Sequence, residues 1–168
     1  MKSFKQYFLE AKQVGILYHY TDVSGVIGIV ETNTLQENGN KYVSFTRDKH
    51  FHKGDRYEGI TGTSCRFIID GDKLSENYKV QPFNYFWNRE QGSSFYLHKD
   101  YLDEQEEIVK SPIRNFSKYV IKCYIDEHHA ECFFEDIDDE TIERPENIYS
   151  YYELLEYFNR YFPTEWAK

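Results

Sequence analysis

Hydrophobic residues in the first half of the chain follow the spacings of three strands and one helix. The helix is predicted directly after residue 22, because apolar side chains recur there every three or four positions: Val23, Val26, Ile27 and Val30. Thr21 or Asp22 can cap its first turn. Short apolar runs predict the strands, at residues 14–20, 42–46 and 65–70.

The second half of the chain mixes strand and helix patterns. One helical turn is predicted at 73–78, and an acidic run at 103–107 leads into a short apolar strand. Alternating positions predict a strand at 118–125 with a hairpin partner at 131–135. A last helix, capped by Ser150, has its apolar residues at inward-facing positions: Tyr151, Leu154, Leu155, Phe158 and Phe162. This order of short strands and helices predicts an α+β fold.

The length and composition are those of one globular domain. We expect residues 13–168 to form it, preceded by an amphipathic segment at 1–12. Aromatic residues make up 18% of the chain, with 16 tyrosines. Because tyrosine combines apolar area with a hydroxyl, this content suits a ligand cleft with polar walls, and it suits an ordinary tyrosine-rich core equally well.

Net charge, hydropathy and cysteine count indicate which partners and which cellular compartment to expect. The net charge of −9 argues against nucleic acid as a partner, because phosphate binding needs clustered Lys and Arg. No apolar run approaches the roughly 20 residues of a membrane span, so no membrane association is expected. Three cysteines, an odd number, suit a reducing compartment. We therefore expect a cytoplasmic protein.

Histidines and cysteines raise the question of a metal site. His50 and His52 are spaced like ligands, and His128, His129 and Cys132 could complete a set. Zinc sites need such residues to converge in space, and this spacing gives no sign of convergence. We therefore expect no metal.

Polar residues stand at or beside the ends of three predicted strands. His19 and Tyr20 end the first strand, Ser44 and Thr46 the second, and Glu107 directly precedes the third. Side chains placed in this way can meet in one cleft. Each also has a purely structural explanation: a half-buried histidine, solvent-facing strand positions and a solvated acidic run.

The order of these residues resembles the three motifs of the ADP-ribosyltransferase family. A strand ending in His or Arg matches 17–21, a Ser-Thr-Ser-like strand matches 44–46, and an acidic loop whose Glu precedes an apolar pair matches 105–109. The resemblance implies two short packed β-sheets around an NAD cleft, with flanking helices. It also implies a mono-ADP-ribosyltransferase, which is a glycosyltransferase that uses NAD as a substrate and modifies a host protein.

The resemblance assigns the chemistry to the third motif. Glu107 would stabilise the positive charge that develops on the ribose as NAD is cleaved. Gln105 would help to choose the acceptor, Ser44 would orient Glu107, and Thr46 would line the pocket. A register in which Glu106 takes the place of Glu107 competes with this assignment.

The resemblance assigns NAD binding to the first motif, and two arginines offer an alternative that rests on their charge. His19, with Tyr20 beside it, would bind the adenosine-side ribose of NAD. Arg47 or Arg66 would meet the NAD phosphates. The chain departs from the family by combining a His-type first motif with a Ser-Thr-Ser-like second motif, which usually accompanies Arg.

The first twelve residues resemble the head-targeting peptides of large tailed phages. They carry a Met-Lys-x-aromatic start and a Glu10–Ala11 site at which a prohead protease would cut. This resemblance implies a phage-encoded protein, packaged in the phage head and delivered with the virion to the host bacterial cytoplasm. The alternative is a helix that packs on the domain.

Two other functions stay open on the sequence. One is an RNA 2'-phosphotransferase-like or other nucleic-acid-modifying member of the same fold. The other is a non-catalytic phage head or host-interaction protein that keeps the fold without activity.

Overall fold

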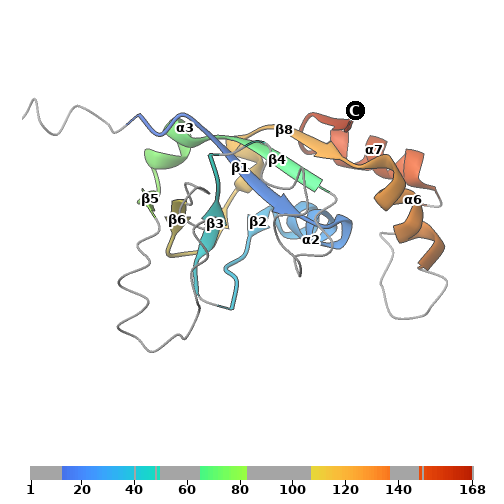
Figure 1. Cartoon of the computed structure of the whole chain (residues 1–168), viewed down its shortest axis with the longest axis horizontal. Coiled ribbons are helices and arrows are strands. Elements are labelled where there is room, and N and C mark those ends of the chain that lie inside the picture. Colours follow the sequence, from blue (N-terminus) through green and yellow to red (C-terminus); the bar gives the residue numbers. More distant parts are fainter. Residues whose placement is uncertain are drawn as a thin grey trace, which may run out of the picture.

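A computed structural model describes residues 13–39, 41–47, 49, 65–82, 107–136, 148 and 150–167 of the chain. Its short strands form three small sheets beside a few short helices, so the predicted α+β class is confirmed (Figure 1). In chain order the elements are β1 (Ile16–Thr21), α2 (Val23–Thr32), β2 (Thr34–Leu35), β3 (Val43–Phe45), β4 (Cys65–Asp70), α3 (Gly71–Ser75), β5 (Gln81–Pro82), β6 (Glu107–Val109), β7 (Ile113–Arg114), the 3-10 helix η1 (Phe116–Tyr119), β8 (Val120–Ile125), α6 (Glu127–Asp136), α7 (Tyr151–Asn159) and β9 (Thr164–Trp166).

The largest sheet has four strands in the order β1-β4-β8-β9. The first two pairs are antiparallel and β8 pairs with β9 in parallel. Because side chains alternate along a strand, Leu17, Phe67 and Cys123 share the buried face of this sheet. In Figure 1, helices α2, α6 and α7 lie on the right of the view and strands β3, β5 and β6 on the left.

The second sheet contains three strands in the order β3-β6-β5, and β2 pairs separately with β7. Its strand β3 is joined to β1 by an isolated antiparallel bridge between Tyr18 and Thr46. The two backbone hydrogen bonds of this bridge measure 2.8 and 2.9 Å between nitrogen and oxygen. The bridge therefore fixes the second sheet against the edge of the first.

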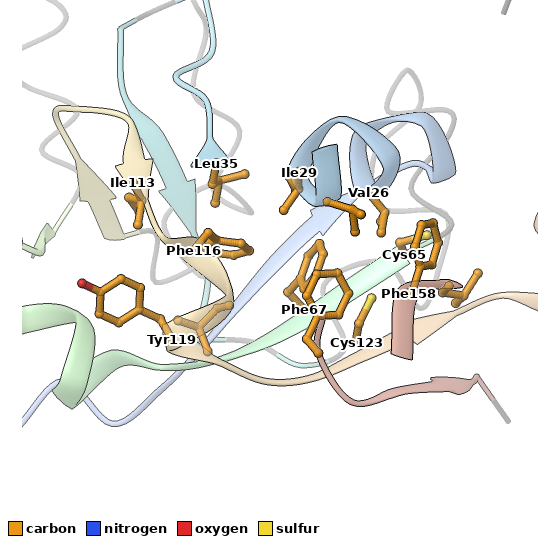
Figure 2. Close-up of a cluster of buried hydrophobic side chains, with 14 of the residues drawn as sticks. Val26, Ile29, Leu35, Cys65, Phe67, Ile113, Phe116, Tyr119, Cys123 and Phe158 are labelled. Carbon is orange, nitrogen blue, oxygen red and sulfur yellow. The ribbon is translucent and has the colours of Figure 1, made fainter. Parts of the chain in front are cut away.

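The core lies on the inner face of the four-stranded sheet (Figure 2). The Phe67 ring packs edge-to-face on Phe116 and Phe162, with ring centroids 5.4 and 5.1 Å apart. Val26 and Ile29 reach the same cluster from α2. This apolar contact orders the strands that carry the candidate site.

Several predicted elements are confirmed, with small shifts of their ends. The 65–70 strand has the predicted bounds, and the first helix is capped by Asp22, whose carboxylate accepts from Gly25 N at 2.6 Å. Ser150 caps the last helix, as predicted. Residues 116–119, partly placed in a strand by the alternation, form η1 instead.

One predicted element was wrong, because residues 131–135 are helical and form no hairpin partner. Asp126 directly follows strand β8. Its carboxylate accepts a hydrogen bond from His129 N at 3.0 Å, and this contact caps the first turn of α6. Ala130 is then buried on the inner side of the helix. The edge position beside β8 belongs to β9, a C-terminal strand that the sequence pattern did not predict.

Candidate active site

The three polar patterns singled out in the sequence come together around strand β3. Its Thr46 end is bridged to β1, which carries His19. Its other edge pairs with β6, in the register Phe45 opposite Glu107 and Ser44 opposite Ile108. One short strand therefore brings the three motifs side by side, although their sequence positions span about ninety residues.

Glu107 is a buried carboxylate, with 5% of the residue exposed. Its Oε1 accepts two hydrogen bonds from Arg47, from Nε at 3.0 Å and from Nη2 at 2.8 Å. Its Oε2 is also buried and has no hydrogen-bond partner among the described residues. Because an unsatisfied buried acceptor is costly, this oxygen marks a point where a ligand hydroxyl or amide can bind.

Arg47 reaches Glu107 because of the strand geometry. It follows Phe45 by two positions, so it points to the same side as Phe45 and as the residue opposite it, Glu107. Its third nitrogen, Nη1, donates to the carbonyl oxygen of Val14, the residue that precedes Gly15 and β1. The structure thus directs Arg47 to the carboxylate, where the sequence had led us to expect a contact with NAD phosphates.

His19 is held between the two sheets as a neutral imidazole. Its Nδ1 lies 2.9 Å from the Ser44 carbonyl oxygen, and because a carbonyl only accepts, Nδ1 carries the proton. Its ring packs edge-on to Phe45 and stacks on Phe67, with centroid distances of 5.8 and 6.5 Å. Burial lowers the pKa of His19, and the bond to Ser44 opposes this shift. The remaining nitrogen, Nε2, is therefore an acceptor.

Two of the predicted NAD-binding residues lie on the opposite face of the four-stranded sheet. Tyr20 follows His19 directly and pairs with Arg66, so strand alternation turns both away from the face that carries His19. The Arg66 guanidinium lies over the rings of Tyr18 and Tyr124, at 6.0 and 5.1 Å. The structure does not bring Tyr20 or Arg66 to Glu107.

The second motif contributes to the site through backbone hydrogen bonds to strand β1. Ser44 is paired with Ile108, so its side chain points to the opposite face from Glu107, and Arg47 occupies the orienting position that we expected for Ser44. Thr46 is buried and supplies the backbone bridge to Tyr18. Gln105 and residues 1–12 lie outside the described residues.

Two further findings concern metals and membranes. Among the described side chains, no group of three or more His, Cys, Asp and Glu residues could hold a metal ion. His50 and His52 fall outside that part of the chain. None of the helices in the described ranges is long and apolar enough to cross a membrane.

Comparisons with known proteins give similarity only at the level of structure. No family model and no curated protein matches the chain. Solved structures of DarT from Thermus sp. 2.9 are similar to it. The complex with NAD+ is 12% identical, with a TM-score of 0.42, over 77% of this chain and 92% of DarT. The complex with carba-NAD+ is 11% identical, with a TM-score of 0.48, over 91% and 95%.

A third similar structure corrects one expectation. It is DarT from the same organism in complex with ADP-ribosylated single-stranded DNA, at 12% identity and a TM-score of 0.41, over 77% of this chain and 91% of DarT. The expectation from the net charge that nucleic acid is not a partner was therefore wrong.

Proposed function

We propose that the protein is an NAD-dependent ADP-ribosyltransferase in which Glu107 is the catalytic carboxylate. The observation that carries this proposal is the geometry of Glu107. One of its oxygens is held by Arg47, and the other is buried without a partner among the described residues. This carboxylate stands at the family's third motif, beside strands that carry the first and second motifs.

The chemistry needs a fixed negative charge. When the bond between the ribose C1' and the nicotinamide nitrogen breaks, nicotinamide leaves with the electron pair and the ribose becomes cationic. An oriented carboxylate stabilises this charge more in the transition state than in the ground state. In this proposal Oε2 of Glu107 accepts a hydrogen bond from a ribose hydroxyl, and the acceptor then attacks C1'.

His19 has the properties of a binding residue. It is neutral, its orientation is fixed by Ser44, and its Nε2 can accept from a ribose hydroxyl. We propose that it holds the adenosine-side ribose of NAD and takes no part in proton transfer. His19→Ala should then weaken NAD binding by about tenfold, the value of roughly one neutral hydrogen bond. An unchanged affinity in calorimetry would remove His19 from the site.

The acceptor is either a protein, as the sequence led us to expect, or single-stranded nucleic acid, as the DarT complex shows for that protein. To identify it, NAD labelled in its adenylate part is incubated with the protein and either a bacterial lysate or single-stranded oligonucleotides. We expect wild type and Glu31→Gln, a control at an exposed position of α2, to label one of the two. Glu107→Gln should label neither. No labelling and no NAD consumption by wild type would refute the proposal.

Phage origin and delivery from the virion rest on residues 1–12 alone. These residues lie outside the described part of the chain, so this part of the proposal stays a prediction from sequence. Mass spectrometry of purified particles would test it, because head packaging predicts the protein in the virion with its N-terminus at Ala11.

A further inference from the structure

The backbone just before β1 is held by a side chain from a distant part of the chain. Both Val14 N and Gly15 N donate to Oδ1 of Asp72, at 2.6 and 3.0 Å. Asp72 is the second residue of α3. Two consecutive backbone donors on one ionised oxygen fix the orientation of the peptide that joins them, and charge-assisted bonds of this kind are among the stronger ones in proteins.

Two glycines make this contact sterically feasible. Gly15 adopts a φ of +72°, a conformation that favours glycine. Gly71 donates its backbone N–H to Gly15 O at 2.9 Å. A Cβ on Gly71 would lie 2.4 Å from Gly15 O and 2.7 Å from Cγ1 of Val14, so a side chain there would push the two segments apart.

The peptide held in this way carries the carbonyl that fixes Arg47. Nη1 of Arg47 donates to Val14 O, while Nε and Nη2 both donate to Oε1 of Glu107. Arginine and carboxylate groups often pair with two parallel hydrogen bonds that use both oxygens. The Val14 carbonyl keeps the guanidinium in an orientation that uses one oxygen only, and Oε2 is left without a partner among the described residues.

We infer that Asp72 is a positioning residue for the catalytic carboxylate. It acts through residues 14–15 and Arg47, and it determines which oxygen of Glu107 faces the substrate. This inference rests on the proposed function and extends it to α3, outside the family's three motifs. Asp72 itself touches neither Glu107 nor Arg47 in any described contact.

The Asp72 side chain is not needed to begin its own helix. Asp70 already caps α3, with its Oδ1 accepting from Lys73 N at 3.0 Å. The Asp72 carboxylate instead reaches a segment 57 and 58 positions away in sequence. Asp70 and Asp72 therefore form a matched pair, one with a local role and one with a role that reaches the site.

Steady-state kinetics of NAD cleavage separate these roles. We expect Asp72→Ala to lower kcat by about 10- to 100-fold, the loss typical of a small misplacement in a site. Its KM for NAD should change little, because the binding residues stay in place. Asp72→Asn keeps an oxygen acceptor and should restore most of kcat. Asp70→Ala removes the cap of α3, and its kcat should stay near the wild-type value. Equal losses in Asp70→Ala and Asp72→Ala, or a change confined to KM, would overturn the inference.

A second measurement tests the inference if wild type proves unable to cleave NAD, an outcome that would refute the proposed function. Denaturation midpoints are compared for Asp72→Ala, Glu107→Gln and the double variant. The two side chains share no described contact, so independent sites would give additive shifts. We expect non-additive shifts, because both act on Arg47. Additive shifts would show that Asp72 does not position the Arg47–Glu107 pair.

Discussion

The four-stranded sheet and the three-stranded sheet bury different kinds of side chain. The inner face of β4 is apolar, with Cys65, Phe67 and Ile69 almost fully buried. Strand β6 also has a buried face, but on that face the apolar Val109 stands beside the charged Glu107, two positions before it in the chain. Burying a carboxylate costs free energy that its ion pair only partly returns. The first sheet therefore stabilises the fold, and the second keeps a charged group that stability alone does not require.

The largest expected effect tests the stabilising role of the first sheet. Phe67→Ala should lower the free energy of unfolding by about 3–5 kcal/mol, because it removes contacts with two aromatic rings and leaves a cavity. Ile121→Ala, at a position 43% exposed on the neighbouring strand β8, should change it by less than about 0.5 kcal/mol. Chemical denaturation measures both, and similar values would contradict the placement of the core.

An intermediate effect tests the pair in the second sheet. Arg47→Ala leaves a buried carboxylate unpaired and should cost about 2–3 kcal/mol, less than a fully buried pair because 29% of the arginine side chain is exposed. Glu107→Gln removes the buried charge and should change stability by less than about 1 kcal/mol. If Glu107→Gln proved the more destabilising of the two, the carboxylate would be part of the stabilising core.

The smallest effect concerns His19, which belongs to the first sheet and hydrogen-bonds to the second. Burial lowers its pKa from the ordinary value of 6.5. The unfolded chain therefore takes up a proton near pH 6.5, and the folded protein does so only at lower pH. Stability contributed by the neutral ring is present above pH 6.5 and is lost as the pH falls from there to the folded pKa.

Denaturation midpoints at pH 7.5 and 5.5 measure this effect. Wild type should lose more stability on acidification than His19→Gln. The difference between the two losses should stay below about 1.4 kcal/mol per pH unit, which is the limit for the uptake of one proton. The same pH dependence in both proteins would show that the imidazole titrates in the folded state as it does in solvent.

Long, regular patterns in the sequence predicted the fold well. The apolar run from Cys65 to Asp70 located β4, and Asp22 and Ser150 located two helix starts through their capping side chains. Residues 131–135 also form a short apolar run and were predicted as a strand, but the helical cap at Asp126 decides their structure. Strands β2, β5 and β7 have two residues each, too short for any periodicity, so tertiary pairing alone defines them.

The sequence predicted that the three motifs would meet. It predicted the arrangement of their side chains less well. The contact between Arg47 and Glu107 joins residues 60 positions apart and depends on the pairing of Phe45 with Glu107. Strand alternation did carry one usable signal: His19 and Tyr20 are neighbours on a strand, so they cannot share a face. The Asp72 contact left no sequence signal beyond the two glycines.

Nicotinamide release from NAD by Glu107→Gln decides whether Glu107 is the catalytic carboxylate. Calorimetry on the same samples shows whether wild type and the variant bind NAD. We expect similar binding and a rate of release at least about 100-fold lower in the variant, the usual loss when a charge-stabilising group is removed. Release at the wild-type rate by Glu107→Gln, or no NAD binding by wild type, would contradict this role of Glu107.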